Sequence, residues 1–104
     1  MTTVIVNAGA CGYTVTIKVE KTGDAKMVVS LETECETVMK LLEDIAVLDR
    51  FTPLTALQNN PVYRAAGKHL RHPACVVPSD ILKAVEVEAG LNVPKDALIR
   101  FVKE

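Results

Sequence analysis

The side chains best suited to bind metal or to react are those of three cysteines and one histidine: Cys11, Cys35, Cys75 and His72. Each cysteine lies where a strand or helix pattern starts or stops, and functional residues concentrate at such junctions. Three thiolates with His72 as fourth ligand would suit Zn²⁺, and three thiolates with one open iron would suit a [4Fe–4S] cluster. The leading hypothesis is a cysteine-ligated metal or iron–sulfur binding module.

The cysteines are far apart in the chain, with the spacing C-x23-C-x39-C. Zinc ribbons and knuckles carry compact C-x-x-C pairs, which are missing here, so a shared site requires the fold to bring distant loops together. Cysteine is also among the residue types most often buried as plain packing. Three unrelated, packed cysteines are therefore an alternative of equal weight.

The sequence around Cys35 supports a second hypothesis, a thiol redox protein or enzyme. Thr33 is predicted to cap a helix, and Glu36 to complete a capping box with it. Cys35 would then lie in the first helical turn, where free backbone N–H groups and the helix dipole favour a thiolate. In this hypothesis Cys35 is the nucleophile, with His72 as base or Cys75 as resolving thiol.

A second histidine, His69, lies one helical turn before His72 on a predicted helix. We interpret His69 as a helix histidine with a hydrogen-bond partner rather than as a ligand. Gly9 and Gly12 flank Cys11 in a loop that is far from any phosphate-binding motif and is interpreted as a turn.

Three strands are expected to position the first two cysteines. Residues 4–6 are short and apolar, and residues 13–20 and 26–32 alternate between apolar and polar side chains. This period of two predicts strands with one solvated face, as in an antiparallel sheet. Gly23 and its neighbours predict a hairpin turn between the two alternating strands.

Helical patterns follow the strands. Apolar residues at helical spacing predict a helix over 34–48. Asn60 and Pro61 predict the start of a helix that reaches about residue 70, and Ser79 is predicted to cap a helix over 80–89 that Gly90 ends. Residues 97–102 are predicted to form a last strand.

The predicted order is β-β-β-α-α-α-β within one domain, residues 1–104. Strands and helices that are segregated along the chain indicate an α+β fold of two layers, a mostly antiparallel sheet with the helices on one face. The last strand is expected to return to that sheet, at an edge or beside the first strand.

Composition and charge exclude several partners. The chain has 12 basic and 13 acidic residues, a net charge of −1 and no basic block, so a nucleic-acid partner is not expected. No apolar run is long enough for a membrane span, and the start lacks the pattern of a signal peptide, so we expect a cytoplasmic protein. In a reducing cytosol its thiols are expected to be free, metal-bound or redox-active. A third hypothesis is a structural or interaction domain, for example a homo-oligomer, whose exposed strand edge or aliphatic surface binds another chain.

Three segments resemble a known family: 7–13 (NAGACGY), 34–36 (ECE) and 69–78 (HLRHPACVVP). They are similar to small uncharacterised three-cysteine domains of anaerobic bacteria and methanogenic archaea, and the resemblance extends over nearly the whole chain. That family has no established activity, so the resemblance implies no function. It implies an anaerobic setting, in which iron–sulfur chemistry is common.

Overall fold

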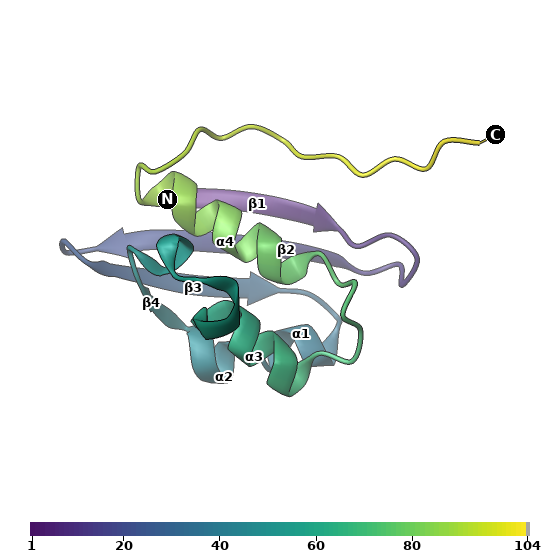
Figure 1. Ribbon diagram of the computed structural model, residues 1–104, viewed down its shortest axis with the longest axis horizontal. Helices are drawn as coiled ribbons and strands as arrows, with labels where there is room; N and C mark the ends of the chain where they lie inside the picture. Colours follow the sequence, from purple (N-terminus) through teal and green to yellow (C-terminus); the bar gives the residue numbers. More distant parts are fainter. Residues whose placement is uncertain (104) are drawn as a thin grey trace.

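Four strands and several short helices make up the protein, whose computed structural model describes residues 1–103. In chain order the elements are β1 (Thr2–Asn7), β2 (Thr14–Thr22), β3 (Lys26–Glu32), α1 (Glu36–Met39), α2 (Leu42–Ile45), β4 (Val47–Asp49), the 3-10 turns η1 (Thr52–Leu54) and η2 (Leu57–Asn59), α3 (Pro61–His69) and α4 (Val77–Glu88). The predicted α+β class is confirmed (Figure 1).

The sheet has the order β1-β2-β3-β4, and every neighbouring pair is antiparallel. Its register places Val6 opposite Val15 and Ile17 opposite Leu31. Alternate residues of β2 and β3 are buried, as the period of two predicts. The hairpin predicted between these two strands is confirmed.

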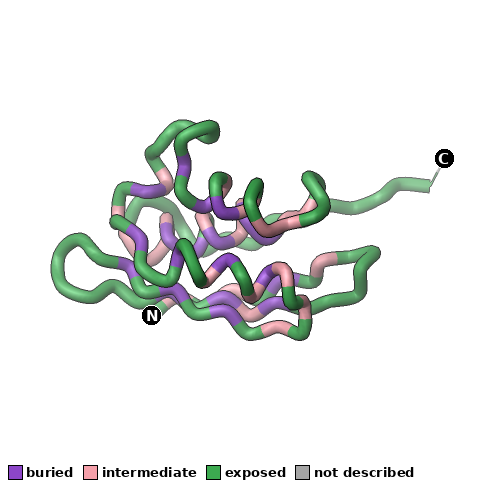
Figure 2. The backbone as a smooth tube through the Cα atoms, turned by 90° about the horizontal axis from the view of Figure 1, so that it is seen from below, coloured by how far each residue is buried: buried purple, intermediate pink, exposed green. Residues whose placement is uncertain are grey.

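The helices cover one face of the sheet. Helix α4 packs on β1 and β2, α1 and α2 pack on β3, and α3 lies against α2 and α4. Buried residues line the space between the two layers, whereas the opposite face of the sheet is largely exposed (Figure 2). The core is aliphatic, and its largest fully buried side chains are Ile17, Met27, Leu41, Ile45 and Ile81. Each such side chain contributes about 1.5–3 kcal/mol through removal from water.

The prediction of a single continuous helix over 34–48 is wrong. It is divided into α1 and α2, which are joined by tighter bonds from Leu41 N–H to the Val38 carbonyl and from Glu43 N–H to the Lys40 carbonyl. The chain then leaves the helix, and β4 pairs with β3. Leu48 is buried in β4, as it would be in the predicted helix, because a single inward-facing residue is compatible with both a helical and a strand pattern.

Two predicted helix starts are also wrong. Cys35, not Thr33, is the N-cap of α1, and the Thr33 hydroxyl instead accepts a hydrogen bond from the Cys35 N–H at 3.2 Å. Helix α4 begins at Val77, before Ser79, whose hydroxyl donates to the Val76 carbonyl at 2.9 Å. Pro78 fits inside the first turn because a backbone N–H is not needed there.

Two other helix ends are confirmed. The Asn60 side chain caps α3 by accepting a hydrogen bond from the Val62 N–H at 3.0 Å. Gly90 follows α4 with a φ of 76°, which is strained for other residues. The Gly90 N–H donates to the Val87 carbonyl and the Leu91 N–H to the Glu86 carbonyl, the pair of bonds that defines a Schellman motif.

The last strand predicted over 97–102 is absent. Residues 92–103 form no helix or strand, and all are exposed. In Figure 1 this segment leaves the end of α4 and runs as an extended trace in the same direction as β1, and its end reaches beyond the rest of the domain. The fourth strand of the sheet is β4 instead. Within residues 1–103, no helix has the length and apolar character needed to cross a membrane.

Candidate functional site

The junctions that carry Cys11 and Cys35 project from the same end of the sheet. β1 ends at Asn7, opposite the start of β2, so the loop with Cys11 leaves the sheet here. β3 is antiparallel to β2 and ends at Glu32 beside the start of β2, so the chain continues to Cys35 from this same end. The two junctions lie together at one end of the sheet in Figure 1.

Cys75 belongs to this end as well. The Glu88 carboxylate, in the last turn of α4, accepts hydrogen bonds from the Thr2 hydroxyl at 2.7 Å and from the Lys21 N–H at 3.0 Å, at the opposite end of the sheet. Helix α4 is about 18 Å long, close to the length of β1, so its start lies near the end of β1. Cys75 comes two residues before that start.

Cys11 lies at the tip of its loop and is exposed. The loop is closed by hydrogen bonds from the Ala8 N–H to the Tyr13 carbonyl at 3.0 Å and from the Gly12 N–H to the Gly9 carbonyl at 2.9 Å. The interpretation of this segment as a turn is confirmed. Nothing in it shields the Cys11 thiol from solvent.

Cys35 is half-buried and packs against the edge of the core. Its Sγ atom lies 3.4 Å from the Oγ1 atom of Thr37, within hydrogen-bond distance for sulfur. The bond from the Cys35 N–H to Thr33 fixes the backbone just before the helix. Cys35 therefore has a defined position and a polar partner.

The pKa of Cys35 is set by opposing influences. Partial burial is the largest and raises the pKa of the thiol, and the nearby Glu36 carboxylate raises it further. Hydrogen bonds to the sulfur from the Thr37 hydroxyl and from the backbone N–H groups of Val38 and Thr37 lower it. These bonds prevail, so the pKa of Cys35 lies below its ordinary value, which favours the nucleophilic thiolate.

Cys75 and His72 lie together in the loop between α3 and α4. The Cys75 N–H donates to the His72 carbonyl at 3.1 Å, and the Cys75 side chain is half-buried against the core. A pocket of about 290 Å³ borders both residues. Its lining also includes Tyr63, Leu70, Arg71 and Pro78. The pocket thus combines a thiol with an aromatic ring, an apolar wall and a guanidinium group.

The four predicted site residues are only partly brought together. His72 and Cys75 share the pocket, whereas Cys11 and Cys35 are not part of its lining. All three cysteines are free thiols. Residues 1–103 contain no group of three or more His, Cys, Asp or Glu side chains placed to hold a metal ion. The metal centre of Cys11, Cys35, Cys75 and His72 stays a prediction.

Comparison with known families gives a match over nearly the whole chain. The model of a family of unknown function, DUF6951, covers residues 2–101. The chain belongs to this family. No curated protein matches it, and no solved structure does. The DUF6951 match includes all three cysteines and both histidines, and its description assigns no activity to them.

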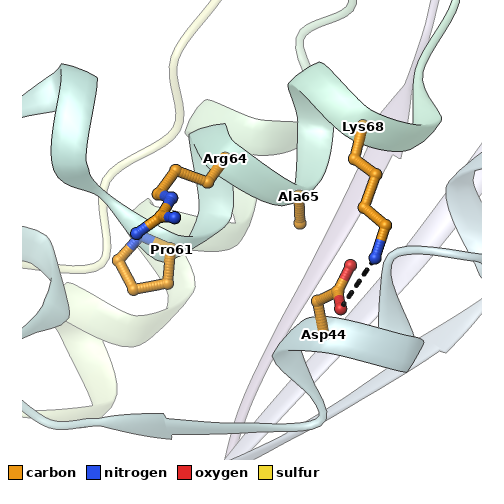
Figure 3. A pocket seen from close by; sticks show the side chains of 5 residues that line it. All are labelled: Asp44, Pro61, Arg64, Ala65 and Lys68. Atoms are coloured by element: carbon orange, nitrogen blue, oxygen red, sulfur yellow. Dashed lines mark ion pairs between the residues drawn. The ribbon is translucent and has the colours of Figure 1, made fainter.

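The histidine interpreted as a helix residue, His69, has a partner in this DUF6951 domain. Its Nε2 atom lies 2.8 Å from the Oδ2 atom of Asp44 in α2, which confirms that interpretation. The Lys68 Nζ atom lies 3.7 Å from Asp44 Oδ1 at a second pocket, lined also by Pro61, Arg64 and Ala65 (Figure 3). These charges connect α2 to α3 at the surface, where ion pairs add little stability.

Sequence reasoning missed two features of the DUF6951 site. Thr37 is the side-chain partner of Cys35, and the only feature of the sequence that could have indicated this contact is that the two residues are two positions apart. Tyr63, in the first turn of α3, and Arg71, in the loop after α3, line the same pocket as Cys75. Nothing in the local pattern around Tyr63 indicates this, since the pocket depends on how α3 meets the start of α4.

Proposed function

We propose that this protein is a thiol-based redox module in which Cys35 is the attacking thiolate and Cys75 the resolving thiol. The observation that carries the proposal is the hydrogen-bonded sulfur of Cys35, which lies 3.4 Å from the Thr37 hydroxyl and has a lowered pKa. Low-pKa, partly accessible thiols are the usual sites of thiol–disulfide exchange. In the cytoplasm both thiols would rest in the reduced state.

The reaction consumes a low-molecular-weight disulfide. The Cys35 thiolate attacks one sulfur of that disulfide, forms a mixed disulfide and releases one thiolate. The Cys75 thiol then loses its proton, attacks the Cys35 sulfur and releases the second thiolate. The protein retains a Cys35–Cys75 disulfide, and two electrons have passed from it to the substrate.

The surroundings of both cysteines support these roles. Cys35 and Cys75 are half-buried, pack against the same core and belong to the same end of the sheet, whereas Cys11 is exposed. The pocket beside Cys75 is lined by Arg71, whose guanidinium group favours anionic species such as a departing thiolate.

The test is thiol alkylation as a function of pH. The reduced protein is treated with iodoacetamide in short pulses, and the modified fraction of each cysteine is measured by peptide mass spectrometry. We expect Cys35 to reach half its maximal rate at a lower pH than exposed Cys11, which serves as the internal reference. A Cys35 profile at or above that of Cys11 would remove the proposal.

The second candidate is the cysteine-ligated metal or iron–sulfur module, with Cys11, Cys35 and Cys75 as ligands and His72 as the fourth. It is favoured by one observation, that the three cysteine-bearing junctions lie at the same end of the sheet. The exposed Cys11 loop would have to close over the other two thiols. Anaerobic purification followed by zinc, iron and sulfide analysis tests it, and a protein free of all three would exclude it.

A further inference from the structure

The C-terminal segment of this chain has the sequence pattern of a strand, but it pairs with no other strand in the part of the chain that the structure describes. In 97–102 (ALIRFV), Ala97, Ile99 and Phe101 alternate with Leu98, Arg100 and Val102. The exposed fractions are 75% for Leu98, 74% for Ile99 and 96% for Phe101. Four large apolar side chains within five residues are rarely left in water without a partner.

β1 provides a matching free edge. It pairs with β2 on one side, and within residues 1–103 no strand pairs with it on the other. Ile5 in β1 is 72% exposed on the open face of the sheet. β1 and the segment 97–102 both have six residues, whereas the other edge strand, β4, has three. A long exposed edge invites addition of another strand.

The direction of the chain disfavours pairing of this segment with its own β1. Glu88 ties the end of α4 to Thr2, so the C-terminal segment begins beside the start of β1. In Figure 1 the segment runs from there in the same direction as β1, so pairing with its own β1 would be parallel, which is the less stable arrangement. The molecule extends 47 Å along its longest axis against 28 and 25 Å along the others, with the C-terminal segment reaching out from the domain (Figure 1).

We propose that residues 97–102 add as a fifth strand to the β1 edge of a second copy of this chain, and that the exchange is reciprocal. A copy related by a two-fold axis can present its segment to β1 in the antiparallel direction, and the same contact forms twice. One face of the added strand would extend the helix-covered side of the sheet, and the other would lie beside Ile5. Since Phe101 alone buries about 150–250 Å², two such segments bring the interface near the roughly 1,200–2,000 Å² of stable dimers.

The inference is independent of the thiol chemistry and is tested with the full reduced chain. We expect light scattering after gel filtration to give twice the chain mass of 11.3 kDa. The double variant Ile99→Asp, Phe101→Asp should weaken the dimer by about thirtyfold or more. The matched control, Lys103→Asp, changes a charge outside the strand and should remain dimeric. Because residues 99 and 101 are exposed, the variant should retain the fold of the domain, which circular dichroism checks.

Hydrogen exchange distinguishes the alternatives. We expect slow amide exchange over 2–7 and 97–102 in the wild type, and fast exchange over 97–102 in the double variant. A monomer with a fast-exchanging C-terminal segment would overturn the inference, and so would a monomer in which that segment is protected by its own β1. A dimer that the double variant leaves intact would place the interface elsewhere and would overturn it equally.

Discussion

The Sγ atom of Cys35 lies 3.4 Å from the Oγ1 atom of Thr37, and this contact is the side-chain interaction that lowers the pKa of the thiol. Thr37→Ala should raise the pKa of Cys35, because burial would then be opposed by backbone hydrogen bonds alone. Loss of one hydrogen bond predicts a fall of about three- to tenfold in the alkylation rate of Cys35 near neutral pH.

Thr37→Ser is the matched control, since it keeps the hydroxyl and should keep most of the rate. Cys11 in the same samples should be unaffected. Equal rates for Cys35 in the wild type and in Thr37→Ala would show that the hydroxyl does not act on the sulfur.

Asn60 is 1% exposed and holds the segment between β4 and α3. Its side-chain amide donates to the Thr52 carbonyl at 2.8 Å, and its side-chain oxygen accepts from the Val62 N–H. Asn60→Ala should lower the free energy of unfolding by about 2–3 kcal/mol, since it removes a cap and leaves buried groups unpaired. Asn59→Ala, at the exposed neighbouring position, should change it by less than about 0.5 kcal/mol. Urea denaturation of both variants measures the difference, and similar midpoints would contradict the structure.

Glu88 joins the end of α4 to the sheet. Because folding lowers its pKa, we expect the stability of the protein to depend on pH. The hydrogen bond from the Thr2 hydroxyl is the main cause that lowers the pKa of Glu88, helped by the Lys21 N–H and the terminal amine and opposed by burial. A carboxylate whose pKa is lowered by folding stabilises the protein above its unfolded pKa. That contribution is lost as the pH falls through the lower folded pKa.

The variant Glu88→Gln should therefore cost about 1 kcal/mol at pH 7, and the cost should shrink as the pH falls below about 4, the ordinary range for glutamate. Thermal unfolding of wild type and variant at several pH values measures this convergence. Exposed Glu20→Gln is the control. A gap between wild type and Glu88→Gln that stays constant down to pH 2.5 would rule out the assigned role of the carboxylate.

The hairpin of β2 and β3 could be predicted from the sequence because both strands bury every second residue, and that period has no helical counterpart. The stretch 34–48 could not be predicted correctly, because a buried residue such as Leu48 satisfies either pattern and the pairing of β4 with β3 decides between them. The segment 97–102 has a local strand pattern, but whether a strand forms depends on a neighbouring edge, which a local pattern does not specify.

The candidate site was predictable in its residue types and in its general place. Loops at strand and helix ends could be identified for Cys11, Cys35 and Cys75. The antiparallel order brings the first two loops to one end of the sheet, and the position of α4 brings Cys75 there. The distances between side chains depend on the rotation of each short helix and on the packing of α3 against α4. No periodicity contains that information, so Thr37 and Tyr63 were found only in the structure.

The central claim, that Cys35 and Cys75 act as a pair, is tested most directly by mapping disulfides after limited oxidation. The reduced protein is exposed to an equimolar low-molecular-weight disulfide, free thiols are blocked, and the peptides are analysed by mass spectrometry. We expect an intramolecular Cys35–Cys75 disulfide with Cys11 blocked as a free thiol, and in Cys75→Ser a mixed disulfide that persists on Cys35. Oxidation that begins at Cys11, or a Cys35 mixed disulfide that persists in the wild type, would contradict it.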